Sequence, residues 1–430
     1  MPLYYNADAI SNKADNFEKE TNTEGILLTM ANNKKIKDSP IGAKPSTDTG
    51  EVEVQEPAYE LSEYDKKLIK ANRRRNILLG SVFLVGTLTL GTVFFVTTSQ
   101  NTTIELSSVG SIVGQNAEVA SFDSEWFANA IDIVLDDNGI GYFSNSELHK
   151  IYKLDRGSVT EFAGTGVDDL EEGNLLNASF ASPTGLSFQG NAVYVADQGN
   201  HRIRKIDLTT GDVTTVAGSG PGRYALGELV DGAIADARFN GPMGVVVDSD
   251  GTIYVADTGN NAIRKISGDT VSTLAGGGNS GDAEGTGSAA KFNGPRSVAI
   301  LDATNLLVAD TSNNKLKIVN KTTGETKTFA GNGSLALKDG TLLSASFYSP
   351  SDVLVTQAGN IFIADTFNHA IRVIPRSSNN VYILTGNGEP GFKDGKMSEA
   401  IFDSPISIVE ERDGAILVVD AGNKTIRRLK

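Results

Sequence analysis

Cysteine is absent from the 430-residue sequence, and histidine and tryptophan are scarce, with three copies and one copy. Without cysteine the chain has no disulfide, thiol nucleophile, redox pair or Cys-type zinc site. Positive charge is also in deficit, since 38 Lys and Arg stand against 53 Asp and Glu, for a net charge of −15. An acidic chain repels phosphate backbones, so we expect no nucleic-acid partner.

The chain does contain one segment that recurs five times, at intervals of 53 to 60 residues. Its copies are VYVADQGNHRIRKI at 193–206, IYVADTGNNAIRKI at 253–266, LLVADTSNNKLKIV at 306–319, IFIADTFNHAIRVI at 361–374 and ILVVDAGNKTIRRL at 416–429. This period is too long for a repeat made of two helices. It predicts an array of supersecondary units.

Each unit reads as four antiparallel strands. A Pro opens the unit, and two apolar runs joined by a turn such as SDG lead to VAD; an alternating run and a Val/Thr run ending in Ala-Gly follow. Four strands joined by short turns make a propeller blade. A sixth, divergent copy starts at Ala130 and carries Asn145 in place of the Asp. We therefore predict an all-β fold, a six-bladed β-propeller.

The last copy ends at Lys430, straight after its third strand, so its outer strand must come from elsewhere. The segment IELSSVG at 104–110 is similar to the outer strand VTTVAG, and ASF at 120–122 is similar to the connectors between blades. We expect residues 104–109 to pair with residues 425–430. Such an N-terminal strand would close the ring and remove an open sheet edge.

The blades resemble NHL repeats, whose Asn-His followed by an Ile-Arg step is present as NHRIR at 200–204 and NHAIR at 368–372. The resemblance covers residues 104–430 and implies a six-bladed propeller. Three copies depart from it, with Asn261, Asn314 and Lys424 in place of the His. Some NHL propellers bind RNA, but this chain lacks the basic face that RNA binding requires. Related propellers include metal-dependent lyases, hydrolases and lactonases.

Ahead of the repeats, Ile77 to Val96 is an uncharged and mostly apolar run of 20 residues, the length of a transmembrane helix. Six Lys and Arg lie between residues 66 and 75, and none occurs from 76 to 149. The positive-inside rule then places the N-terminus in the cytoplasm and the propeller outside, as in a type II membrane protein with a signal-anchor. A cleaved signal peptide fits less well, because about 75 residues precede the run.

Four parts of the chain follow from this interpretation. Residues 1–59 read as a disordered cytoplasmic tail, because they are polar and lack a sustained period. Residues 60–76 read as a basic juxtamembrane helix, 77–96 as the transmembrane helix and 104–430 as the propeller.

Catalytic chemistry has weak support in the sequence. His149, His201 and His369 share one repeat position, a turn about 10 Å or more from the axis, so they cannot share a zinc ion. The expected innermost strands carry no His, and two of their acids, Asp132 and Asp352, could face the central channel. Two further sets recur with the repeat, which indicates structural roles. The repeated Asp (Asp197, Asp257, Asp310, Asp365 and Asp420) should form turn caps and intrablade ion pairs with a following Arg or Lys, and the repeated Phe (Phe122, Phe180, Phe239, Phe292, Phe347 and Phe402) should pack between blades.

Residues that interrupt the repeat are the candidate binding residues. Trp126 and Phe127 lie in the first connector, Arg223 and Tyr224 lie in an insertion at 221–229, and Phe367 replaces a turn Gly of the repeat. Aromatic residues and Arg are typical of interface centres. Alternatively, these residues fold back onto the blades.

Two functions remain open. The first is a single-pass membrane protein that displays the propeller to a protein or glycan ligand on the connector face, as a receptor, adhesin or scaffold, without a cofactor or catalytic residues. The second is a membrane-tethered propeller enzyme of the lyase or hydrolase type, with a carboxylate-bound metal near the central channel.

Overall fold

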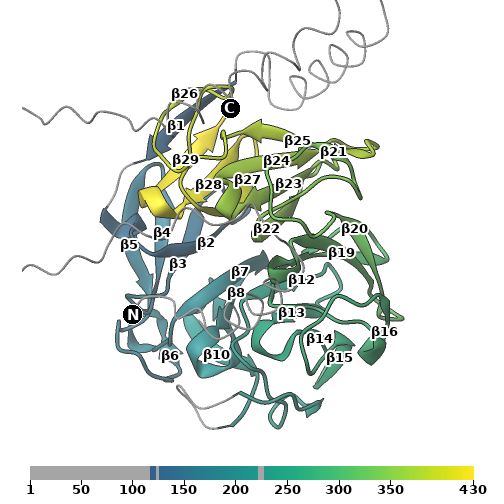
Figure 1. Cartoon of the computed structure of the whole chain (residues 1–430). Helices are drawn as coiled ribbons and strands as arrows, with labels where there is room; N and C mark the ends of the chain where they lie inside the picture. The colour runs from purple at the N-terminus through teal and green to yellow at the C-terminus, as the bar shows by residue number, and fades with distance from the viewer. Residues whose placement is uncertain (1–116, 123–124, 221–226) are drawn as a thin grey trace, which may run out of the picture. The chain divides into compact units, whose positions relative to one another are not determined.

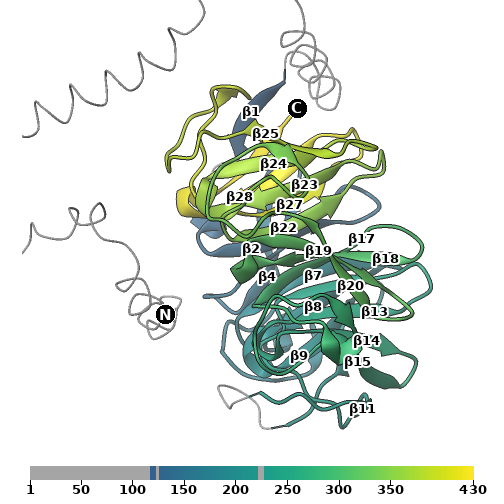
Figure 2. The same cartoon turned by 45° about the vertical axis from the view of Figure 1, so that its right-hand side comes forward.

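A computed structural model describes residues 117–122, 125–220 and 227–430 of the chain. These residues form six antiparallel sheets arranged around a common centre (Figures 1 and 2), which confirms the six-bladed β-propeller. The predicted tail, juxtamembrane helix and membrane span at 1–96 lie outside the described residues. Within the described ranges, no helix has both the length and the apolar character that a membrane crossing requires.

Each blade has four main strands, as the repeat predicts. The innermost strands are Ala130–Leu135 (β2), Pro183–Gln189 (β7), Gly244–Val247 (β12), Pro295–Ile300 (β17), Pro350–Val355 (β22) and Pro405–Glu410 (β27). The second strands are Gly141–Asn145 (β3), Ala192–Asp197 (β8), Ile253–Asp257 (β13), Asn305–Asp310 (β18), Ile361–Asp365 (β23) and Ile416–Asp420 (β28). The third strands are Lys150–Asp155 (β4), Arg202–Asp207 (β9), Ala262–Ser267 (β14), Lys315–Asn320 (β19), Ala370–Ile374 (β24) and Thr425–Leu429 (β29). The outer strands are Ser158–Ala163 (β5), Asp212–Ala217 (β10), Thr270–Gly276 (β15), Glu325–Ala330 (β20), Asn380–Thr385 (β25) and Glu118–Phe122 (β1).

Blades 2 to 6 each carry a fifth, two-residue strand that the repeat did not predict. These strands are Gly173–Asn174 (β6), Gly232–Ala233 (β11), Gly285–Thr286 (β16), Gly340–Thr341 (β21) and Gly395–Lys396 (β26). Each belongs to the connector from the preceding blade and pairs with the outer strand of its own blade, as β11 does with β15. The connector therefore covers the outer edge of the sheet, which would otherwise offer unpaired backbone groups.

Short 3-10 turns complete the fold. One follows the second strand of blades 2 to 6, and three lie in connectors. They are Gln198–Asn200 (η3), Thr258–Asn260 (η4), Thr311–Asn313 (η6), Thr366–Asn368 (η7) and Ala421–Asn423 (η8), with Glu125–Phe127 (η1), Leu175–Asn177 (η2) and Gly287–Ala289 (η5) in the connectors.

The ring is closed by an N-terminal strand, but not by the predicted one. Strand β1 (Glu118–Phe122) pairs with β29 in the last blade, with Val119 opposite Leu429 and Ser121 opposite Arg427. Residues 104–109 lie outside the described ranges, and residues 120–122, for which the sequence predicts a connector, belong to the closing strand. Hydrogen bonding confirms the register. Ser121 N–H donates to Asp394 at 3.1 Å, as Thr273 N–H in the outer strand of blade 3 donates to Asp231 at 3.0 Å.

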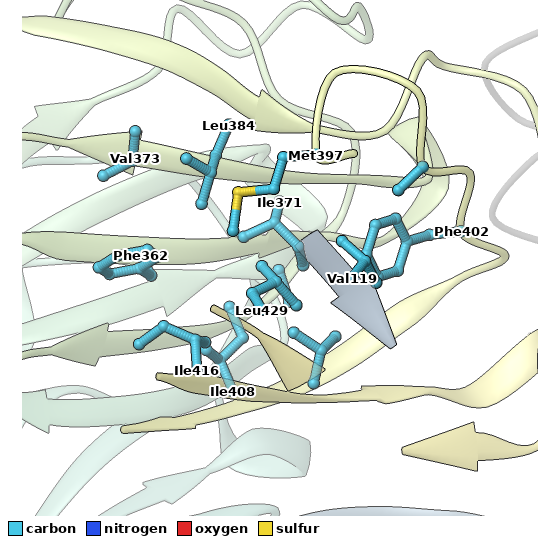
Figure 3. Packing of buried hydrophobic residues seen from close by; sticks show 13 residues of the cluster. Val119, Phe362, Ile371, Val373, Leu384, Met397, Phe402, Ile408, Ile416 and Leu429 are labelled. Carbon is cyan, nitrogen blue, oxygen red and sulfur yellow. The ribbon is translucent and has the colours of Figure 1, made fainter. Parts of the chain in front are cut away.

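The core lies between neighbouring blades rather than at one central point. In Figure 3, Val119 of the closing strand packs in one cluster with Leu429 and Met397 of blade 6 and Phe362 of blade 5. Apolar faces of adjacent sheets are buried against each other in this way around the ring. The closing strand is therefore held by side-chain packing as well as by its backbone ladder.

The repeated connector Phe residues pack in these interfaces, as predicted, with one correction. Phe180, Phe239, Phe292, Phe347 and Phe402 are fully buried. Each lies three residues before the Pro that opens its blade, and Phe127 lies three residues before Ala130. Phe127 is 1% exposed and is therefore the sixth copy, whereas the predicted Phe122 is a half-buried residue of β1.

Candidate functional site

The repeated acids form buried ion pairs inside their own blades, as predicted. In every pair both side chains have no exposed surface. The pairs are Asp197–Arg204 at 3.0 Å, Asp257–Arg264 at 2.7 Å, Asp310–Lys317 at 2.9 Å, Asp365–Arg372 at 2.8 Å and Asp420–Arg427 at 3.0 Å.

Each pair joins three segments of its blade. In blade 2, Asp197 Oδ1 accepts from the N–H of Ala181 at 2.7 Å, and Oδ2 accepts from Asn200 and from Arg204. Arg204 also donates to the carbonyl of Ser179 and lies over the ring of Phe180. Burial raises the pKa of Asp197 to about 6, although the charge of Arg204 opposes the rise. Both oxygens of the Asp197 carboxylate are therefore engaged inside the blade, and the carboxylate has no exposed surface.

Blade 1 carries a neutral version of this arrangement. Asn145 stands in the Asp position, and Tyr152 stands seven residues later, where the other blades have Arg or Lys. Asn145 accepts from the N–H of Leu148 at 2.9 Å and donates to the carbonyl of Ala128 at 2.7 Å. The ring of Trp126 lies 5.4 Å from that of Tyr152. Aromatic packing thus replaces the buried charge pair.

The three histidines join neighbouring blades and do not form a metal site. His149, His201 and His369 have positive φ angles of 54°, 56° and 47°, and the Nδ1 of each accepts from the backbone N–H that precedes the first Pro of the next blade. For His201 the donor is Gly241, at 2.8 Å. Asn261 makes the same contact through Oδ1, with Gly294 at 2.9 Å. In the described part of the chain, no group of three or more His, Asp or Glu could hold a metal ion.

The innermost strands surround a central channel of about 350 Å³. Its charged wall residues are Asp132, Arg296 and Asp352, all near the start of their strands. Toward the other end of the strands the wall is apolar. It includes Leu135, Phe188, Val246, Ile300, Val355 and Val409.

The two channel acids are far apart in the sequence but lie on either side of the innermost strand of blade 6. Asp132 of blade 1 accepts from the Ser407 hydroxyl in that strand and from the Leu186 N–H of blade 2 at 2.7 Å. Asp352 of blade 5 accepts from the Ile408 N–H at 2.8 Å and from the Ser297 hydroxyl of blade 4 at 2.6 Å. Each acid thus connects three blades.

These acids influence each other. Burial and the negative charge of Asp352 raise the pKa of Asp132 to about 7. Burial also raises the pKa of Asp352, while its hydrogen bonds and the charge of Arg296 oppose the rise. The channel therefore contains an acid that titrates near neutral pH, which is a recurrent property of functional sites and also of structural networks.

The same strand position carries Gly in blades 2 and 3. Gly185 donates its N–H directly to the Met243 carbonyl of the next blade at 2.8 Å, and an added Cβ would lie 2.3 Å from that oxygen. An added Cβ at Gly244 would lie 2.5 Å from the Arg296 carbonyl oxygen. Around the channel, blades 2 and 3 are therefore linked onward by close backbone approach, whereas the other blades have Asp or Ser side chains at this position.

The connectors and the turns after the second strands form one face, here called the connector face. Blade 5 differs from the others there. Phe367 is 39% exposed, Tyr348 is 37% exposed, and their rings meet edge to face with centroids 5.2 Å apart. Leu335, 60% exposed, lies on the same connector through its bridge to Phe347. These three residues are here called the blade 5 patch.

At the position of Phe367 the blade 5 patch has a large side chain where several other blades have Gly. Blades 2, 3 and 6 have Gly at the position equivalent to Phe367. The N–H of this Gly donates to the backbone carbonyl of the residue equivalent to Tyr348, as Gly422 does to Asp403 at 2.8 Å. An added Cβ at Gly422 would lie 2.3 Å from the Asp403 carboxyl carbon. Blade 5 keeps the backbone bond at 3.1 Å and accommodates two aromatic rings.

The five candidate binding residues have different positions. Phe367 is exposed on the connector face. Phe127 is buried, and its ring centroid lies 5.2 Å from that of Phe143. Phe127 therefore folds back onto the blades, which is the alternative interpretation. Trp126 is half-buried on Tyr152. Arg223 and Tyr224 lie outside the described residues. Tyr348 is not among the residues predicted from the sequence, although it follows the repeated Phe where other blades have small or polar residues.

Comparison with known proteins supports the repeat. The NHL repeat family model matches residues 180–206 and 239–266, so the chain contains NHL repeats. The chain is 26% identical over 286 residues to Protein SUPPRESSOR OF QUENCHING 1, chloroplastic, of Arabidopsis thaliana, covering 63% of this chain and 27% of that protein. It is 28% identical over 301 residues to NHL repeat-containing protein 2 of Bos taurus, covering 60% and 40%. The chain thus spans less than half the length of these relatives.

Among solved structures, a gluconolactonase from Xanthomonas campestris has a TM-score of 0.50 at 12% identity, covering 75% of this chain and 92% of that one. At this identity the likeness shows the fold alone.

Proposed function

We propose that the chain is a single-pass membrane protein that displays its NHL propeller outside the cytoplasm and binds a protein or glycan ligand on the connector face. The observation that carries the binding proposal is the blade 5 patch. Its two exposed aromatic rings occupy positions that other blades fill with Gly or with small or polar residues, so the packing of the repeat does not require them. Exposed aromatics of this kind are typical interface anchors.

The proposed contact surface consists of Phe367 and Tyr348, with Trp126, Arg223 and Tyr224 as further candidates. The acidic composition of the chain favours ligands that are neutral or basic. Membrane anchoring through Ile77 to Val96 is proposed from the sequence, as is the cytoplasmic N-terminus.

A crosslinking experiment tests the contact. A photoreactive phenylalanine is placed at position 367 of the full chain, or at Leu343, which is 62% exposed in the same blade, as the matched control. We expect one dominant adduct from position 367, and its loss when Tyr348 is also changed to Asn, the residue at the equivalent position in blades 3 and 4. Equal labelling from both positions would refute the contact surface.

Topology is tested separately. Protease added to intact cells should cleave the connectors and leave residues 1–75 protected. The reverse pattern would show that the propeller is cytoplasmic.

A second candidate function is a membrane-tethered enzyme with a metal near the channel. The observation in its favour is that Asp132 and Asp352 lie in the channel wall. In the described part of the chain these two acids have no third acid or His beside them to complete a metal site, which is why we rank it second. Stoichiometric zinc or calcium in the purified chain would reverse the order.

A further inference from the structure

The central channel has two chemically different ends. Asp132, Asp352 and Arg296 lie near the start of the innermost strands, and aliphatic and aromatic side chains follow toward the other end. A volume of about 350 Å³ is within the range of small-molecule sites. The channel is therefore suited to a short ligand with one polar end and one apolar end.

The charge of the wall selects the polar end of that ligand. Two carboxylates and one guanidinium leave an excess of one negative charge when both acids are ionised. Asp132 and Asp352 each place one oxygen, Oδ2, on a single backbone donor, Leu186 or Ile408. A carboxylate oxygen can accept about two hydrogen bonds, so each Oδ2 keeps capacity for another donor.

The two acids are also placed to act together. They flank adjacent residues of one strand, since Ser407 contacts Asp132 and Ile408 contacts Asp352. Each oxygen Oδ1 is occupied by a Ser hydroxyl and a backbone N–H, which fixes the orientation of the carboxylate. A fixed pair of acceptors is suited to a compact donor with several N–H groups, and an ammonium group has three.

We propose that the channel binds a primary ammonium ligand with a short apolar tail, held by Asp132 and Asp352 at its charged end and by Val246, Val355 and Val409 along its tail. The ligand neutralises the excess charge and displaces any proton that the two acids share. This site is independent of the proposed partner surface on the connector face, because none of its residues belongs to the blade 5 patch.

The test uses n-hexylammonium as the probe, titrated calorimetrically into the full chain, with a blank titration into the same buffer. Hexan-1-ol and hexanoate, which have the same tail without the positive charge, are the ligand controls. We expect hexylammonium to bind, and neither control to bind within tenfold of it. Shortening the tail to n-butylammonium should weaken binding by about fourfold per methylene lost.

Variants and pH identify the site. Asp352→Asn should weaken binding at least tenfold, whereas Asp250→Asn, the same change in an exposed turn, should not alter it. The charged groups of the wall are Asp132, Asp352 and Arg296. A proton held by the two acids competes with the ammonium group, so binding by the unchanged protein should tighten from pH 5.5 to 8, with release of a proton. This pH arm decides the question even if Asp352→Asn does not fold.

Three results would overturn the proposal. They are equal affinity for hexan-1-ol, an equal loss in Asp250→Asn, and no binding of hexylammonium at pH 8. The last result would mean that the two acids serve only to join the blades.

Discussion

Arg204 donates from Nη1 to Asp197 Oδ2 at 3.0 Å, and neither side chain has any exposed surface. Removing one member of such a pair leaves the other charge buried without compensation. Blade 1 provides a natural neutral substitute, with Asn145 and Tyr152 at the same two positions.

Asp197→Asn should therefore lower the free energy of unfolding by about 3 to 5 kcal/mol. The double variant Asp197→Asn/Arg204→Tyr, which copies blade 1, should recover at least half of that loss. Denaturant unfolding of the wild type, both single variants and the double variant gives the coupling energy. A double variant less stable than Asp197→Asn would contradict the interpretation of blade 1.

The hydrogen bond that the histidine accepts at the blade junction is expected to contribute to stability. His201→Ala should cost about 1 to 3 kcal/mol, because the Gly241 N–H loses its partner. His201→Asn should have little effect, because Asn261 makes the same bond at the next junction and Asn tolerates a positive φ. Equal losses in the two variants, measured by thermal unfolding, would point to packing of the imidazole ring instead.

Ring closure by β1 can be tested with one substitution at two adjacent positions. Val119 is 2% exposed and contacts the cluster in Figure 3, whereas Ala120 is exposed. Val119→Asp should lower the unfolding temperature strongly, because it buries an unpaired carboxylate. Ala120→Asp should change it little. Similar small effects in both variants would show that the closing strand contributes little to stability.

Asp132 should make stability fall as the pH rises. Its pKa in the folded protein, about 7, lies above its ordinary value of 3.8, so the folded state binds the proton more tightly than the unfolded state between these values. Its stabilising contribution is complete below about pH 4 and is lost as the pH rises through 7. Asp132→Asn should therefore be more favourable relative to the wild type at pH 8 than at pH 4.5, by urea titration. A pH-independent difference would show that the carboxyl group titrates normally.

The amino-acid sequence by itself determined the blade. Alternation of apolar residues, Gly/Asn turns and the spacing of Asp197 from Arg204 are local features, and each blade satisfies them within about 55 residues. The innermost strands, the ion pairs and the packing of the connector Phe residues were therefore predictable. Phe127 was also within reach, because its distance from Ala130 matches that of Phe180 from Pro183, but its place beside the only Trp concealed this match.

Tertiary structure decided the contacts that join distant parts of the chain. The local pattern of residues 104–109 predicted the closing strand, whereas in the structure Glu118–Phe122 pairs with β29, where Val119 lies opposite Leu429 and Ser121 contacts Asp394. Asp132 and Asp352 lie more than two hundred residues apart in the sequence, and their coupling arises because the ring brings blades 1 and 5 to either side of blade 6. The free energy of such contacts depends on burial and distance in the folded ring, which no local pattern records.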